Sequence, residues 1–187
     1  MNIDPCCAAK DFLRAYYREL EDMIYGMSRT KDCNSIACCF TSKMLQHSRS
    51  AIAISENLLE GSFFEPPRII AKHIIEDGRQ NITNMRKILN TYSKYRDNKD
   101  DLNSYNRSAA LICERMFDEM RTAEMRERIN CDYLRIMMPH SEGAVRLAEN
   151  AIGYGLSQNL VPIARSIISE KKQLIAEIQK LLCMIDC

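Results

Sequence analysis

The stretch Met44-Leu-Gln-His-Ser-Arg-Ser-Ala-Ile-Ala-Ile-Ser-Glu-Asn57 returns 93 residues later as Met137-Met-Pro-His-Ser-Glu-Gly-Ala-Val-Arg-Leu-Ala-Glu-Asn150. Between residues 44 and 89 the shifted chain matches itself without a gap at 14 of 46 positions, whereas chance gives about three. A unit of three helices is too small to bury its own apolar stripe, which disfavours two separate units on a linker. We therefore predict one domain over residues 1–187, in which repeats at about 8–95 and 101–187 share a core with pseudo-twofold symmetry.

The composition points to long helices. The 187 residues include six Gly and five Pro, about half the usual share, which argues against a loop-rich or many-stranded fold. Apolar residues recur at helical spacing nearly everywhere, and this predicts an all-α fold. Asn103 and Ser104 are predicted to cap the fourth helix and Ser157 the sixth. The breaks in the pattern place six helices at about 7–28, 37–60, 67–95, 103–127, 131–154 and 159–185.

Charge and motifs exclude several classes of function. Twenty-six basic and 25 acidic residues give a net charge of +1, so no nucleic-acid partner is expected. The N-terminus lacks the pattern of a signal peptide, and no apolar run approaches the roughly 20 residues of a membrane span. We expect a protein made in the cytoplasm without membrane insertion. The nucleophile elbow, P-loop, dinucleotide fingerprint and zinc-protease motifs are absent from the sequence, so an enzyme is not expected.

Two methionine–histidine pairs lie on the apolar stripes of the second and fifth predicted helices. Met44 precedes His47 by three residues, as Met137 precedes His140, and each pair shares one helix face. If the repeats pack face to face, all four converge near the pseudo-axis. Thioether and imidazole ligands suit Cu(I), so copper is a possible cofactor. The alternative is that each histidine is a core residue bonded to a Tyr or Glu, with methionine filling gaps.

Both copies of this motif also resemble a known family. Met137-Met-Pro-His-Ser-Glu-Gly-Ala-Val-Arg-Leu-Ala, followed by Leu160-Val-Pro-Ile-Ala-Arg-Ser, is similar to domain-of-unknown-function family 305. Met44-Leu-Gln-His-Ser-Arg-Ser-Ala-Ile resembles the first copy, and the resemblance covers roughly residues 37–182. It implies a duplicated, ferritin-like helical bundle that binds copper or silver through the Met and His of each copy. The family motif has two adjacent histidines, and this chain has Ser48 and Ser141 at the second position.

Nine cysteines are an odd number, so they cannot all pair within one chain. If the helices alternate up and down, as short loops favour, eight of the nine lie at the two ends of the bundle. Cys113 is mid-helix, where a thiol acts as a small buried hydrophobe. The first end holds Cys6, Cys7, Cys131, Cys183 and Cys187, and the second end holds Cys33, Cys38 and Cys39.

Four interpretations of these thiols remain open. Zinc is disfavoured because no CxxC pair exists, a Cu(I)–thiolate cluster could use Cys183 and Cys187, and Cys113 and Cys131 could be incidental thiols. The fourth interpretation is cross-linking: a non-enzymatic protein that assembles with itself into a disulfide-bonded layer or filament, like a spore coat. We rank this function first, with a Cu(I)-binding or storage bundle as the alternative. The candidates for bonds between molecules are Cys6, Cys7, Cys33, Cys38, Cys39, Cys183 and Cys187.

Overall fold

The structure, a computed structural model, describes residues 5–29, 33–92 and 94–187. Within these ranges every regular element is an α-helix, so the predicted all-α class is confirmed. The helices are α1 (Pro5–Ser28), α2 (Ile36–Gly61), α3 (Glu65–Tyr92), α4 (Lys99–Arg121), α5 (Ile129–Gly153) and α6 (Val161–Met184).

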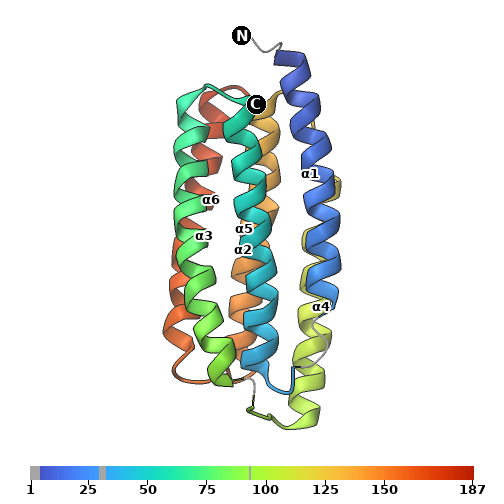
Figure 1. The fold of residues 1–187 in the computed structure, drawn as a ribbon, viewed down its shortest axis with the longest axis vertical. Helices are drawn as coiled ribbons and strands as arrows, with labels where there is room; N and C mark the ends of the chain where they lie inside the picture. The colour runs from blue at the N-terminus through green and yellow to red at the C-terminus, as the bar shows by residue number, and fades with distance from the viewer. Residues whose placement is uncertain (1–4, 30–32, 93) are drawn as a thin grey trace.

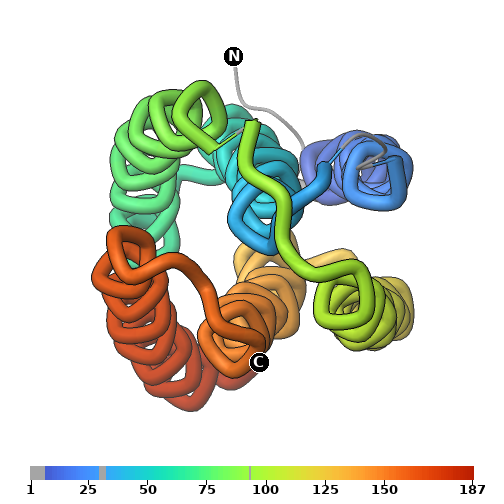
Figure 2. The backbone as a smooth tube through the Cα atoms, turned by 90° about the horizontal axis from the view of Figure 1, so that it is seen from below, coloured from blue at the N-terminus to red at the C-terminus, as the bar shows by residue number. Residues whose placement is uncertain are grey.

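The six helices run alternately down and up the long axis, as Figure 1 shows. Viewed along that axis, α1, α2 and α3 form one row, and α4, α5 and α6 form a second row beside it (Figure 2). Helices α2 and α5 therefore meet at the centre, with α1 and α4 on one side of them and α3 and α6 on the other. Among the described residues, no helix has the length and apolar content needed to cross a membrane.

The two rows carry equivalent interactions at positions 93 apart. Arg79 on α3 pairs with Glu56 on α2 at 3.0 Å, and Lys172 on α6 pairs with Glu149 on α5 at 2.9 Å. Each pair joins the central helix of a row, α2 or α5, to its outer neighbour, α3 or α6. The 93-residue offset between the sequence repeats thus also relates these two ion pairs.

Both ends of α4 differ from the predicted bounds of about residues 103 and 127. Helix α4 ends at Arg121 rather than near residue 127, because the buried carboxylate of Asp132 accepts the backbone N–H groups of Arg126 and Arg128 at 2.9 and 3.0 Å. These bonds fold residues 122–128 into a loop. The cap of α4 is Asn98, whose side chain accepts from the Asp100 N–H at 2.8 Å, so the predicted caps at Asn103 and Ser104 are wrong.

Ser157 does not cap α6. This helix begins at Val161 without a side-chain cap, and a proline stands in its first turn, where a missing N–H costs little. The Ser157 hydroxyl instead shares a 2.8 Å hydrogen bond with the Tyr92 hydroxyl at the end of α3. Helix α3 itself ends at Tyr92, short of the predicted residue 95, and a backbone hydrogen bond from Tyr95 to Tyr92 closes the following turn.

A disulfide joins Cys131, in the first turn of α5, to Cys187 at the C-terminus. The two Cα atoms are 5.5 Å apart and the cysteines are 56 residues apart in sequence. Arg135 supports the closure by donating to the Cys187 carbonyl at 2.8 Å. The interpretation of Cys131 as an incidental thiol is therefore wrong, and Cys187 is bonded within the chain rather than available for a bond between molecules.

Breaking this disulfide should lower the free energy of unfolding by about 4 kcal/mol, because the bond closes a long loop in the unfolded chain. We expect Cys131→Ser and Cys187→Ser to lower the urea midpoint equally, and reductant to do the same to the wild type. Cys183→Ser removes an exposed thiol from the same end of the bundle and serves as the matched control. Identical urea midpoints with and without reductant would contradict the bond.

Candidate functional site

The central contact of α2 with α5 brings two histidines together. The ring centroids of His47 and His140 are 3.7 Å apart, and their planes are inclined by 29°. Both side chains are 1% exposed, and Met44 and Met137 are buried beside them in the same core. The predicted burial of all four residues is confirmed.

The two rings differ in their hydrogen bonds. His47 donates from Nε2 to the backbone carbonyl of His140 at 2.9 Å, so its Nδ1 keeps the lone pair. Both ring nitrogens of His140 are buried without a hydrogen-bond partner among the described residues. Leaving a buried polar group unpartnered costs about 1–3 kcal/mol. The hydrogen-bond partner of His47 is thus a backbone carbonyl and not the Tyr or Glu of the alternative interpretation. The ring nitrogens of His140 have no hydrogen-bond partner among the described residues.

Burial keeps both imidazoles neutral. Loss of water lowers the pKa of His47 to about 4, against the opposing effect of its bond to His140, and the charge of Lys171 lowers it further. Burial also holds the pKa of His140 well below its usual range, helped by His47 and Lys171. At neutral pH both rings are therefore in the form that can ligate a metal.

A small cavity lies next to His47, between α2, α3 and α6. Its volume is about 10 Å³, the room for one water-sized species. Residues that carry soft or nitrogen donor groups line it, among them Met44, Met85 and His47. The remaining lining residues are Ser48, Ala51, Ile74, Gly78, Asn81, Ile167 and Lys171. Met137 and His140 are absent from this lining, so the cavity unites only half of the predicted ligand set.

Met85 is the residue that sequence reasoning missed. It lies on α3, is 2% exposed, and contributes a second thioether to the cavity. The position 93 residues later is Ile178. Because this sulfur has no repeat counterpart, the comparison of the two copies could not reveal it. Helical spacing from the buried Ile74 and Gly78 was the available signal.

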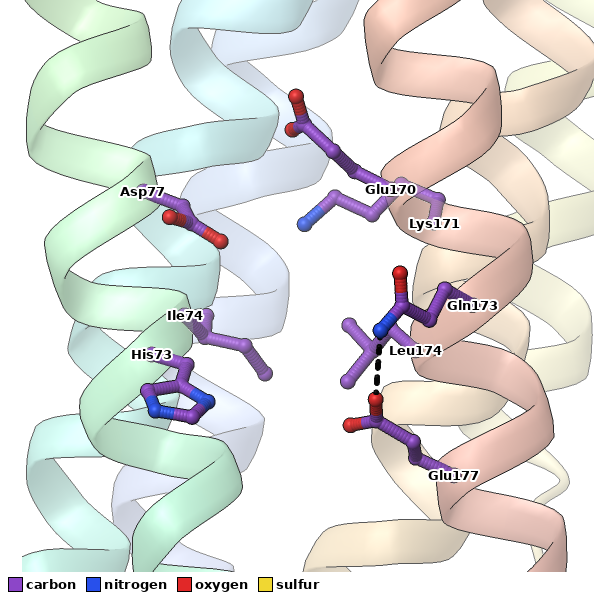
Figure 3. A pocket seen from close by; sticks show the side chains of 8 residues that line it. All are labelled: His73, Ile74, Asp77, Glu170, Lys171, Gln173, Leu174 and Glu177. Carbon is purple, nitrogen blue, oxygen red and sulfur yellow. Dashed lines mark hydrogen bonds between the residues drawn. The ribbon is translucent and has the colours of Figure 1, made fainter.

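A groove between α3 and α6 approaches this cavity from the surface, and Figure 3 shows the side chains around it. The groove has a volume of about 240 Å³ and carries the carboxylates of Asp77, Glu170 and Glu177. Ile74 and Lys171 line both spaces, so they form the wall between groove and cavity. Burial lowers the pKa of Lys171, while Asp77 and Glu170 oppose that shift.

The cysteines differ in how far they are buried. Cys7 and Cys183 are exposed, Cys33 is half-buried, and Cys38 and Cys39 are buried. Bonds between molecules through Cys38 or Cys39 are therefore at odds with the structure, because the first turn of α2 would have to open. The side chain of Cys6 lies outside the described residues. Cys113 is buried, as predicted. Within the described part of the chain, no group of three or more His, Cys, Asp or Glu side chains could hold a metal ion.

These features define an all-helical bundle with a sulfur- and imidazole-lined centre. The model of the DUF305 family, described as a domain of unknown function, matches residues 38–182, and the chain belongs to this family. No curated protein and no solved structure matches the chain significantly.

The buried histidines should make stability depend on pH. Their folded pKa values lie below the ordinary value of 6.5, so the unfolded state takes up protons first as the pH falls and stability decreases from about pH 6.5 downward. We expect His47 to contribute a loss of about 2 kcal/mol between pH 7 and pH 5, and His140 to add a loss in the same direction. Urea midpoints of metal-free protein measure this loss. His47→Gln should reduce this slope. Equal slopes in the wild type and in His47→Gln would refute the assignment.

Proposed function

We propose that the protein binds Cu(I) at the centre of the bundle, in a non-enzymatic binding or storage role. The observation that carries the proposal is the shared cavity of Met44, Met85 and His47. Two thioethers and a neutral imidazole are ligands that favour Cu(I) over hard cations such as Mg²⁺ or Ca²⁺. His140 stacks on His47 with both ring nitrogens unpartnered, outside the lining of this cavity.

The hydrogen bond of His47 suits this role. A metal-ligating histidine commonly donates its other ring N–H to a carbonyl, which fixes the tautomer and orients the ring. The Nε2 bond to the His140 carbonyl does this here and leaves Nδ1 as the ligating atom. Carboxylates of Asp77, Glu170 and Glu177 along the groove favour the approach of a cation. The ammonium of Lys171, at the wall between groove and cavity, repels the cation at the last step of its approach. The charge of this residue therefore affects the affinity for Cu(I).

The family and the repeated contacts support a finer proposal for the architecture. We infer that the two rows are a duplicated, ferritin-like unit whose equivalent positions meet at His47 and His140. Net charge near zero supports the absence of a nucleic-acid partner.

Anaerobic titration with Cu(I) against a chromogenic competitor should give one tightly bound copper per chain. We expect His47→Ala to weaken binding at least about a hundredfold, or ~2.7 kcal/mol, because the imidazole that lines the cavity is lost. Met85→Leu keeps the volume, removes the sulfur, and should weaken binding about tenfold. X-ray absorption of the loaded protein should report sulfur and nitrogen neighbours.

Three variants serve as controls. His73→Ala removes the exposed histidine and should not change the affinity. Replacing every cysteine except Cys131 and Cys187 by serine should leave the copper in place. Lys171→Gln removes a positive charge from the cavity wall and should tighten binding. Copper that survives His47→Ala and Met85→Leu but disappears with the cysteines would refute the central site.

Assembly through disulfides stays as a second proposal, because Cys7 and Cys183 are exposed at the same end of the bundle. Disulfides at this end join two copies. An assembly of more than two copies also requires a disulfide through Cys33 at the opposite end. This would build the cross-linked, coat-like layer or filament expected from the composition.

Oxidised protein should therefore run as dimers on a non-reducing gel, with higher species only when Cys33 is present. Cys183→Ser should weaken the dimer band, and reductant should abolish it. Cys113→Ser changes a buried thiol and is the control. A protein that stays monomeric after oxidation at high concentration would exclude this mode of assembly.

A further inference from the structure

Three thiols gather where the chain turns into α2. The hydroxyl of Ser35 caps the helix by accepting the Cys38 N–H at 3.2 Å. The Cys39 thiol donates to the backbone carbonyl of Cys33 at 3.8 Å. The Cys33 sulfur lies 3.5 Å from the Ser42 hydroxyl. Cys33 thus faces residues of the first two turns of α2.

The three thiols differ in access and in charge. Cys33 is half-buried and reaches solvent, while Cys38 and Cys39 are buried. Hydrogen bonds from Cys39, Cys38 and Ser42, together with the charge of Lys43, lower the pKa of Cys33 to about 6 against the effect of burial. The pKa of Cys39 is raised, first by its bond to Cys33, and burial raises that of Cys38 to about 12. The cluster therefore holds one thiolate and two thiols at neutral pH.

Lys43 adds the smallest of the contributions that favour the negative charge on Cys33, after the hydrogen bonds. Its side chain is buried, with Nζ donating to the Met27 carbonyl at 2.8 Å. An ammonium held in this way cannot swing out to solvent. The first turn of a helix also favours a nearby anion. Cys33 is thus stabilised as an anion by fixed groups.

The arrangement does not suit a metal, and it suits a bond to another molecule only at Cys33. No group of three such ligands among the described residues could hold a metal ion, and two of the three sulfurs are shielded from any partner chain. An accessible thiolate beside a protonated buried thiol is instead the arrangement of an attacking and a resolving cysteine.

We propose that Cys33 is a hydroperoxide-reactive thiol and that Cys39 resolves it within the same chain. The Cys33 thiolate attacks one oxygen of hydrogen peroxide, the O–O bond breaks, and hydroxide leaves and is protonated to water. Cys33 becomes a sulfenic acid, oxidised by two electrons, and the peroxide is reduced. The Cys39 sulfur then displaces the hydroxyl group, which leaves as water with the Cys39 proton, and a Cys33–Cys39 disulfide forms.

Mass-spectrometric peptide mapping tests the sequence of events. Full-length protein, with Cys131–Cys187 intact, is treated at pH 7 with one equivalent of hydrogen peroxide. The expected product is one new disulfide, Cys33–Cys39. Cys39→Ser should accumulate a sulfenic acid at Cys33 that dimedone captures, and Cys33→Ser should abolish both products. A bond to Cys38 would overturn the assignment of Cys39, and prior oxidation of Cys183 would overturn the proposal.

The pH dependence of alkylation gives a readout that a structural role for Cys33 would not change. The rate of iodoacetamide labelling at Cys33 should be half-maximal near pH 6. Ser42→Ala removes one stabilising hydroxyl and should move the midpoint upward, with circular dichroism confirming an unchanged helix content. A Cys33 rate that rises in proportion to hydroxide up to pH 8 would overturn the proposal.

Discussion

The antiparallel contact of α2 with α5 is the constraint on which the rest of the bundle depends. Polar groups fix the register of this contact at two heights: His47 bonds to the His140 carbonyl, and Ser55 shares a 2.9 Å hydrogen bond with the Tyr133 hydroxyl. Sliding one helix along the other would break both bonds and leave buried groups unpaired, at a cost of about 1–3 kcal/mol each. The outer four helices cover these central two and exclude water from the polar groups between them.

The proposed copper site lies where water is excluded. In a dry interior an imidazole stays neutral, and a hard cation that gave up its hydration shell would meet methionines and an imidazole among the residues that line the cavity. A soft monovalent ion such as Cu(I) loses less hydration free energy and binds sulfur more strongly. Lys171 of α6 adds a positive charge at the wall of the cavity. A substitution at this residue would therefore change the electrostatic potential at the site.

Much of this architecture could be predicted because it depends on periodicity. The spacing of apolar residues placed Met44 and His47 in the core, and the 93-residue offset correctly indicated that His47 would meet its counterpart. Features without a local or repeated signal were not predictable. Met85 has no sulfur in its counterpart, and Asp132 ends α4 through backbone bonds that depend on the three-dimensional loop. The pairing of Cys131 with Cys187 depends on how the start of α5 and the residues after α6 meet at one end of the bundle.

The disulfide between Cys131 and Cys187 has a topological consequence. It turns α5, its following loop and α6 into a closed covalent ring with the remainder of the chain attached at one point. Helix α6 cannot leave its own chain to occupy the same place in a second copy, so exchange of this helix between molecules is barred while the bond is intact. A single cut in the loop between α5 and α6 would leave both pieces joined, and Lys171 would stay tethered to the bundle whose cavity it closes.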